Sequence, residues 1–388
     1  MQVLYLCPDG IMDDLGQTQV LSYILGLQKK GYKFIILSFE RSDRKKEEFL
    51  KQSEILKNKN IKWYYLPFYP AKFNRLLRLI FGALQLFIIN KKNKIDLVHL
   101  RSINAGIIFL FSGIQKKYLY DIRAFAGQIG DYGLLRKRSF ILSTLSFFER
   151  KLIKNANGIV VLDKSGSDYI KENFNLFVPQ KIIPTSTKIK PLKKKDINNH
   201  KVIKFVFLGG ARFPYLPKKA LKFIKFLLKN KINCTIDIIN ERHHKFIKED
   251  IKNVNFPRDK IKIFPLKPSE ISKNLTNYDC GLVFIETGDW IKMSSPTKIG
   301  EYLAAGLHVL GLDGIEVLNR LSQETRSVDT LPRDFNYLSK DIIRVKKILE
   351  NIKNPNRIEE SIKIAKKYYD INNALKSYHE LYKKIDND

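Results

Sequence analysis

The residues best suited to chemistry lie between Asp279 and Leu312, in the run DCGLVFIETGDWIKMSSPTKIGEYLAAGLHVLGL. Ser294 or Ser295 is a suitable N-cap for a helix that starts at Pro296, where a missing N–H costs nothing. The free N–H groups and the dipole of a helix start bind anions such as phosphate. Glu301 lies deeper in the same helix, within reach of a polar group beside that phosphate, such as a ribose. The spacing therefore predicts a phosphate site at the helix start.

A second group of residues suits the same chemistry. The run GGARFPYLPKK begins at Gly209 and places Arg212 and Lys218 beside a glycine-rich turn between a strand and a helix. Two cations at such a turn suit a diphosphate, and Lys219 is a further candidate. In so lysine-rich a chain, the alternative is that these are solvated side chains at a helix start. Both explanations stay open from the residues alone.

These residues need a scaffold of alternating strands and helices. Val202–Leu208 and Cys280–Ile285 are short apolar runs typical of buried parallel strands. The helix that starts at Pro296 is expected to stop at Gly306, because glycine tolerates the left-handed position after a helix. Helix starts that follow such strands lie at the carboxyl ends of the sheet, where open α/β sheets bind ligands.

The chain is long enough for two such sheets, at 388 residues. The polar, basic and proline-containing run Pro184–His200 is the best linker between two strand series. Ser361–Ile385 is expected to form one long amphipathic helix. In the first half, we expect strands at Gln2–Cys7, Lys33–Ser38, Ile61–Leu66, Asp96–Leu100, Tyr118–Ile122 and Gly158–Leu162. The three cysteines fall within predicted strands at no metal-ligand spacing, so we expect buried reduced thiols.

The run SSPTKIGEYLAAG resembles the nucleotide-sugar signature of retaining glycosyltransferases of family 4, which have the GT-B fold. That signature is Pro, one residue, Lys, two residues, Glu-Tyr-Leu/Met-Ala, a small residue and Gly. The resemblance implies an α/β fold of two Rossmann-like, doubly wound domains that face each other across a cleft. It assigns residues 1–185 to an acceptor-binding domain, 186–200 to a linker and 201–360 to a nucleotide-sugar-binding domain. Residues 361–388 would form a C-terminal helix that crosses back to the N-terminal domain.

The resemblance also implies roles for individual residues. Glu301 would hold the ribose hydroxyls, and backbone N–H groups near Ser295, Pro296 and Thr297 would meet the diphosphate. Arg212 and Lys218 are the nearest matches to an Arg and a Lys that clamp the diphosphate in the family, although the insertion FPYLP shifts their spacing.

Two loops carry further family roles. Gly16, in DLGQTQVL, lies in a loop expected over Pro8–Thr18 and matches a glycine that lets the backbone approach the diphosphate, although a tight turn explains it equally well. Leu266 lies in the Pro265–Ser269 loop, which touches the nucleobase in relatives.

The catalytic groups are less well defined. Many relatives carry a second acid eight positions before the ribose-binding glutamate, and that position is Met293 here. Glu286 and Asp289 lie in the same loop and are substitutes for it or surface charges. Arg123 stands near the place where many relatives have a histidine by the donor sugar.

Two short motifs of the first half match a subset of the family. LVHLRS is its His-x-Arg-Ser motif, and Asp121–Arg123 is its Asp-Ile-Arg motif. Arg123 either holds an anionic group or forms a local ion pair with Asp121.

The function implied is transfer of a sugar from a nucleotide-diphosphate donor, a UDP- or GDP-sugar, to an acceptor hydroxyl with retention. The enzyme would be a hexosyl- or related glycosyltransferase of bacterial surface polysaccharide assembly that acts on a lipid-linked or oligosaccharide acceptor. No metal or other cofactor is expected, because cations and N–H dipoles meet the charge of the leaving group. The alternatives are an inactive nucleotide-sugar-binding protein, an epimerase or phosphorylase of the same fold, and a basic nucleic-acid-binding protein.

The formal net charge of +31 has three competing explanations: nucleic acid, an anionic membrane surface and a compositional bias toward lysine. No nucleic-acid motif accompanies the charge, so we expect no nucleic-acid partner. The Ala71–Lys94 stretch, an apolar core with basic ends, is either a crossover helix or a membrane-surface helix. The N-terminus does not read as a secretory signal, and the longest apolar run, Leu79–Ile89, is too short to span a bilayer. We therefore expect a cytoplasmic protein that is either soluble or peripheral at the inner face of the cell membrane.

Overall fold

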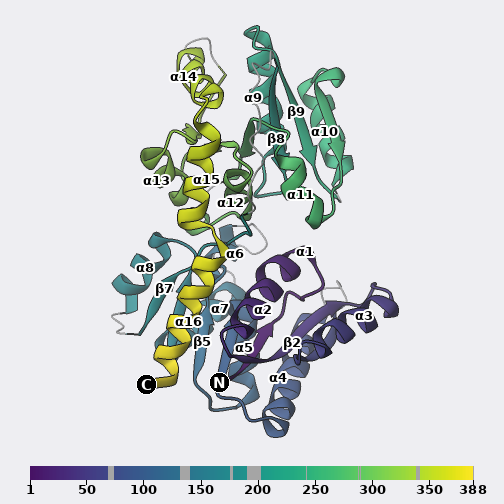
Figure 1. Ribbon diagram of the computed structural model, residues 1–388, viewed down its shortest axis with the longest axis vertical. Helices are drawn as coiled ribbons and strands as arrows, with labels where there is room; N and C mark the ends of the chain where they lie inside the picture. The colour runs from purple at the N-terminus through teal and green to yellow at the C-terminus, as the bar shows by residue number, and fades with distance from the viewer. Residues whose placement is uncertain are drawn as a thin grey trace. The chain divides into compact units, whose positions relative to one another are not determined.

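The chain folds into two α/β units (Figure 1). The computed structural model describes residues 1–68, 74–131, 140–174, 178–189, 202–241, 243–286, 288, 290–337 and 341–387. Part of the Ala71–Lys94 stretch, most of the expected linker and Asp289 therefore lie outside the described residues. Unit 1 comprises Met1–Pro184 and Asn372–Asp388, and unit 2 comprises Thr185–Ile371.

The described strands of unit 1 form one parallel sheet in the order β3-β2-β1-β4-β5-β6-β7. Most strand residues are buried, as expected of a parallel sheet whose strands are near-continuous apolar runs. The strands are β1 (Gln2–Cys7), β2 (Lys33–Arg41), β3 (Lys62–Phe68), β4 (Leu97–Arg101), β5 (Tyr118–Asp121), β6 (Gly158–Val161) and β7 (Gln180–Ile182). The helices are α1 (Asp14–Gly16), the π-helix η1 (Gln17–Leu21), α2 (Ser22–Gln28), α3 (Lys46–Lys57), α4 (Asn74–Lys92), α5 (Ser102–Ser112), α6 (Ala126–Asp131), α7 (Phe140–Asn155), α8 (Lys164–Phe174) and α16 (Ile371–Asn387).

The described strands of unit 2 form a second parallel sheet in the order β10-β9-β8-β11-β12-β13. They are β8 (Ile203–Leu208), β9 (Cys234–Ile239), β10 (Ile261–Phe264), β11 (Cys280–Val283), β12 (His308–Leu312) and β13 (Val328–Leu331). The helices are α9 (Pro217–Lys229), α10 (His244–Val254), the 3₁₀ turns η2 (Arg258–Lys260) and η3 (Ile291–Met293), α11 (Pro268–Leu275), α12 (Thr297–Ala304), α13 (Glu316–Glu324), α14 (Asp341–Lys353) and α15 (Arg357–Tyr368).

The order of both sheets confirms the predicted pair of doubly wound, Rossmann-like domains. In unit 2, β8 is followed in space by β9 on one side and by β11 on the other. The strand order reverses at this place, and the loops that follow β8 and β11 meet there. A topological switch point of this kind is the usual ligand site of an open α/β sheet. It therefore brings the two glycine- and serine-containing loops singled out from the sequence to the same edge.

Two expected elements differ from the structure. The loop expected over Pro8–Thr18 becomes helical at Asp14, because the amide of Gln17 donates to the carbonyl of Asp13. The single helix expected over Ser361–Ile385 is two helices, α15 and α16, with α16 in unit 1.

The second difference has a long-range cause. The amide of Thr187 donates to the carbonyl of Tyr369 at 2.8 Å, and the amide of Ile371 donates to the carbonyl of Thr187 at 3.1 Å. This parallel bridge to a distant segment takes up the backbone groups that a continuous helix would need.

The cysteines are buried and free, as predicted. None of the described helices combines the length and the apolar character that crossing a bilayer requires.

Candidate functional site

The loop after β8 is held in shape by its neighbours. Gly209 has a φ of +114°, a conformation that side chains rarely adopt, and its carbonyl accepts a hydrogen bond of 2.7 Å from Nδ2 of Asn240 at the end of β9. Farther along the loop, Leu216 donates its amide to the carbonyl of Phe284 at 3.0 Å, and Glu286 donates its amide to Pro214 at 2.7 Å. The loop after β8 is therefore joined to the end of β11.

Helix α12 starts beside this loop. The hydroxyl of Tyr302 accepts the amide of Leu208 at 2.8 Å, which fixes the helix to the end of β8. The helix begins at Thr297 with Pro296 in the N-cap position and no side-chain cap. The expected serine cap and the expected start at Pro296 are therefore wrong by one residue, because Pro296 has an extended ψ of 126°. Gly306, with a φ of +73°, follows the helix end in the predicted left-handed conformation.

Lys298, in the first turn of α12, is the notable side chain of this site. It is only 5% exposed, and its Nζ has no hydrogen-bond partner within the described part of the chain. The Nζ lies 4.2 Å from the centre of the Tyr215 ring and 5.0 Å from that of Phe207. A Cβ added to Gly209 would lie 3.1 Å from it, so the ammonium lies directly over the turn after β8.

Ser295 is a second residue of this site with a buried polar atom. Its side chain is buried, and its Oγ likewise lacks a hydrogen-bond partner among the residues described. Its carbonyl accepts a hydrogen bond of 3.1 Å from Oγ1 of Thr185. The first N–H groups of a helix have no partner within the helix. The first turn of α12 and the residue before its N-cap thus carry an ammonium, a hydroxyl and helix-start amides, the kinds of donor that a phosphate oxygen requires.

Burial shifts the pKa values of the two titratable groups of α12. It lowers the pKa of Lys298 to about 7, although the nearby Glu301 carboxylate opposes the shift. It raises the pKa of Glu301 to about 7, although Lys298 opposes that shift. Both side chains are therefore poised near neutral pH, where a bound anion or a hydroxyl group can change their protonation.

Sequence reasoning missed Lys298 as a binding residue. The signal was present, because Lys298 is the lysine of the Pro-x-Lys-x-x-Glu pattern and lies three residues before Glu301. Residues three apart share one face of a helix. Its burial depends on Tyr215 and Phe207, which come from a distant part of the sequence.

The two predicted clamp residues are more exposed than Lys298. Arg212 is exposed, and its guanidinium lies 4.2 Å from the centre of the Phe246 ring. Lys218 is an exposed residue of the first turn of α9. Among the described residues, neither side chain is recorded in an ion pair. Their roles as diphosphate ligands stay predictions.

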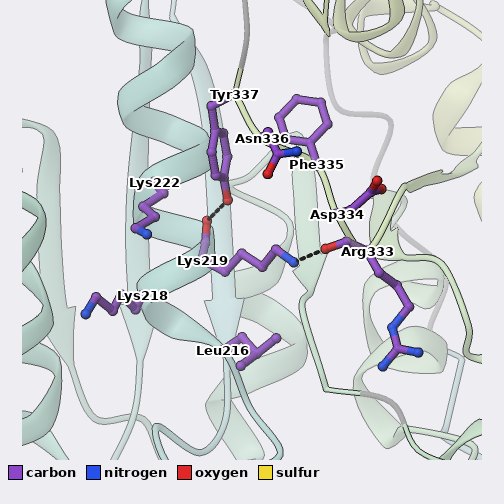
Figure 2. Close-up of a pocket in the computed structure, with 9 residues that line it drawn as sticks. All are labelled: Leu216, Lys218, Lys219, Lys222, Arg333, Asp334, Phe335, Asn336 and Tyr337. Carbon is purple, nitrogen blue, oxygen red and sulfur yellow. Dashed lines mark hydrogen bonds between the residues drawn. The ribbon is translucent and has the colours of Figure 1, made fainter.

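Lys218 lines an open cavity of about 440 Å³ between α9 and the segment after β13 (Figure 2). Figure 2 shows the Lys219 ammonium donating to the carbonyl of Arg333, and the Tyr337 hydroxyl donating to the carbonyl of Lys219 at 3.0 Å. Burial lowers the pKa of Lys219. The described lining is Leu216, Lys218, Lys219, Lys222, Arg333, Asp334, Phe335, Asn336 and Tyr337. The excess of cations suits an anion.

The start of α12 is the better of the two anion sites. In the cavity, Lys219 already donates to a carbonyl, and Arg333 pairs with Glu286 at 3.2 Å. The Lys298 ammonium is buried and lacks a hydrogen-bond partner among the described residues, so it gains more from a bound anion than a solvated lysine does.

The ion pair with Arg333 bears on the catalytic prediction for Glu286. Both side chains are about half exposed, so this carboxylate has the setting of a surface charge. Met293 is buried in the η3 turn. Leu266 follows β10 in the loop before α11, where the amide of Lys267 donates to Oε2 of Glu270 at 3.1 Å. The catalytic role of Glu286 and the base-binding role of Leu266 stay predictions.

Gly16 belongs to unit 1 and is closely packed. A Cβ there would lie 2.6 Å from the carbonyl oxygen of Gly10 and from the Cα of Ile11, so the fold alone requires glycine. The preceding loop is held by the buried Glu40 carboxylate, which accepts the amide of Ile11 at 2.7 Å and that of Met12 at 3.3 Å. Close packing of the turn is therefore sufficient to explain Gly16, and its donor-binding role stays a prediction.

Arg123 forms the local ion pair that was one of its two explanations. Its Nε lies 2.8 Å from Oδ1 of the buried Asp121, and its guanidinium also donates to the hydroxyl of Tyr378 in α16. His99 contacts the same carboxylate at 3.1 Å through Nε2 and the hydroxyl of Tyr382 at 2.6 Å through Nδ1. The His-x-Arg-Ser and Asp-Ile-Arg motifs thus join β4 and β5 to the C-terminal helix within unit 1.

Burial opposes the ionised form of Asp121, yet the neighbouring Arg123, His99 and Arg101 outweigh it and hold its pKa well below the usual range. The role of Arg123 toward an external anion stays a prediction. Within the described residues, no cluster of three or more His, Cys, Asp or Glu side chains has the arrangement of a metal site.

Solved structures share this architecture, although no protein-family model matches the sequence and no curated protein matches it significantly. Sucrose-phosphate synthase from Thermosynechococcus elongatus has 12% identity and a TM-score of 0.71, with 99% of each chain covered. A glycosyltransferase from Rickettsia africae ESF-5 has 15% identity and a TM-score of 0.64, with 99% of this chain and 98% of that chain covered. HepE from Anabaena, solved in complex with UDP-glucose, has 12% identity and a TM-score of 0.65, with both chains fully covered. The chain therefore has the predicted GT-B fold.

Proposed function

We propose that the protein is a glycosyltransferase that moves a sugar from a nucleotide-diphosphate donor to an acceptor hydroxyl. The observation that carries this proposal is the buried Lys298 ammonium, which lies over the turn after β8 at the start of α12 with no hydrogen-bond partner among the described residues. The GT-B fold and the UDP-glucose bound by HepE, a structural neighbour, support it.

In this proposal each group of the site has one task. Lys298, the Ser295 hydroxyl and the amides at the start of α12 bind the diphosphate and stabilise the charge that develops on it as the sugar leaves. Glu301 accepts hydrogen bonds from the ribose hydroxyls and performs no proton transfer. Arg212 and Lys218 add positive charge at the same sheet edge. We keep the expectation that the reaction needs no metal, because these groups supply the positive charge.

The finer features of the proposal rest on the sequence resemblance. They are retention at the anomeric carbon, membership of family 4, a UDP- or GDP-hexose as donor, and a lipid-linked or oligosaccharide acceptor of surface polysaccharide assembly. The exposed cationic cavity beside Glu286 lies in the same unit, but it is not required for the donor to bind.

A panel of sugar nucleotides, including UDP-glucose, UDP-N-acetylglucosamine and GDP-mannose, tests donor binding through thermal stabilisation. At least one should raise the melting temperature of the wild type. Glu301→Ala and Lys298→Met should each lose most of that increase. Lys346→Met, which removes an exposed lysine of α14, is the matched control and should keep it. If Lys298→Met and Glu301→Ala are stabilised as strongly as the wild type, the donor site is not at α12.

A second candidate function is donor binding without catalysis. It is favoured by one observation, the exposed pairing of Glu286 with Arg333, which leaves that loop without a buried carboxylate among its described residues. Release of nucleoside diphosphate that depends on an added acceptor supports the transferase. Donor binding without such release, over a broad set of acceptor glycans, supports the binding protein.

A further inference from the structure

Helix α4 exposes an apolar face that nothing in the described structure covers. The side chains concerned are between 42% and 64% exposed, whereas Ala83, Leu86 and Ile89 on the other side of the helix are buried. Their spacing of three, four and seven residues places them on one stripe of the helix. They are Leu76, Leu77, Ile80, Phe81, Leu84 and Phe87.

This stripe continues onto neighbouring helices. Leu79 of α4 and Phe148 of α7 both pack against the cluster formed by Ile103 and Ile107 of α5 with Ala126, so α5 lies between α4 and α7. Exposed large apolar residues follow on α5 and α7, and the ring of Phe111 lies 5.5 Å from that of Phe148. They are Phe111, Phe140, Ile141 and Phe147. We call these residues, together with the exposed stripe of α4, the apolar face.

The exposed charges of α4 and α7 have one sign, and α5 has no charged residue. Helices α4 and α5 contain no acidic residue, and the acid of α7, Glu149, is buried. The chain has 39 acidic residues in all, so the lack of an exposed acid on these three helices is a local feature. Lys91 and Lys92 are exposed at the end of α4, and the Lys91 ammonium lies 5.5 Å from the centre of the Phe87 ring. The exposed cations of α7 are Arg150, Lys151 and Lys154.

We propose that unit 1 docks on an anionic lipid bilayer through the apolar face, with the lysines of α4 and the cations of α7 at the headgroups. An interfacial helix buries its apolar side in the acyl boundary and is drawn to anionic lipid by basic residues. A second copy of this chain fits less well, because each copy carries a net charge of +31 and the same cations around this face. The inference depends on the surface of unit 1 and not on the proposed reaction.

Vesicle flotation tests the proposal with the full chain and no nucleotide. The wild type should float with phosphatidylcholine vesicles that contain phosphatidylglycerol, and binding should fall as salt is added, because salt screens exposed charges. The double variant Ile80→Glu/Leu84→Glu should bind at least on the order of tenfold more weakly, since two apolar side chains no longer enter the lipid. Lys91→Glu/Lys92→Glu should weaken binding to anionic vesicles.

The matched control is the double variant Leu50→Glu/Ile343→Glu, together with its two single variants, which places two glutamates at exposed apolar positions of α3 and α14. These control variants should bind vesicles like the wild type. Equal binding by the Ile80→Glu/Leu84→Glu variant, or no binding by the wild type, overturns the proposal. So does light scattering that shows a wild-type dimer which the same variant dissociates. The proposed donor site belongs to unit 2, so the increase in melting temperature caused by sugar nucleotides should be unchanged in these variants. The two proposals can therefore fail independently.

Discussion

Lys298 and Glu301 lie one helical turn apart, and their pKa values converge from opposite directions. Each is moved to about 7 by burial, the ammonium downward and the carboxyl upward. Near neutral pH, both exchange protons with small changes in their surroundings. Donor binding should therefore depend on pH in a way that assigns a separate role to each residue.

The affinity for a sugar nucleotide should be highest near pH 7 and fall on both sides. A bound diphosphate favours the charged ammonium, so affinity falls as pH rises through the pKa of about 7 at Lys298. Ribose hydroxyls favour the ionised carboxylate, so affinity falls as pH drops through the pKa of about 7 at Glu301. Titration calorimetry across this range measures both limbs, because the diphosphate of a sugar nucleotide stays ionised throughout.

Two variants separate the alkaline and the acidic limb of this pH dependence. Lys298→Met should lose the alkaline limb and Glu301→Gln the acidic limb, each with weaker binding at pH 7. A wild-type affinity that is flat across this range would mean that neither side chain touches the donor.

At the scale of elements, α12 acts as a unit because Tyr302 fixes it to β8. The Tyr302 hydroxyl is fully buried and accepts the amide of Leu208. Tyr302→Phe leaves that amide without an acceptor, which should lower the free energy of unfolding by about 1–3 kcal/mol. Chemical denaturation measures the change. In the control Tyr368→Phe, the lost hydroxyl bonds Glu324 at an exposed site, so the change should stay within about 0.5 kcal/mol. If both variants lowered the free energy of unfolding equally, the Tyr302 hydroxyl would not be what fixes α12 to β8.

The presence and the end of α12 could be predicted from the sequence, because strand, loop, helix and Gly306 follow one another within one short stretch. Local spacing reports such elements well. The burial of Lys298 was not predictable in this way, because Tyr215 and Phe207 reach it from the other side of the switch point. The break between α15 and α16 also lacks a local signal, since neither glycine nor proline occurs at Tyr369–Asp370 and the cause is the pairing with Thr187. The two Rossmann-like units were predictable, and so was the short-range pairing of Arg123 with Asp121 as one of two explanations, whereas partners from distant parts of the sequence were not.

At the scale of the whole molecule, the end of the chain completes the core of unit 1. Tyr378, Leu381 and Tyr382 of α16 are fully buried, and two of their hydroxyls bond the network around Asp121. The preceding helix, α15, packs against α12 and belongs to unit 2. Two consecutive C-terminal helices therefore stabilise different units.

Substitution of a buried residue in each helix should separate these effects. Leu381→Ala leaves a cavity in the core of unit 1 and should cost about 2–5 kcal/mol of the stability of that unit. Ile364→Ala in α15 is the matched change for unit 2. Hydrogen exchange followed by mass spectrometry measures the protection of backbone amides in each unit separately, and the amides of the less stable unit exchange first. Leu381→Ala should reduce protection in β1 and β4, at the opposite end of the sequence, and leave β11 and β12 protected. Ile364→Ala should do the reverse. If Leu381→Ala instead reduced protection in β11 and β12, α16 would contribute to the stability of unit 2, contrary to this prediction.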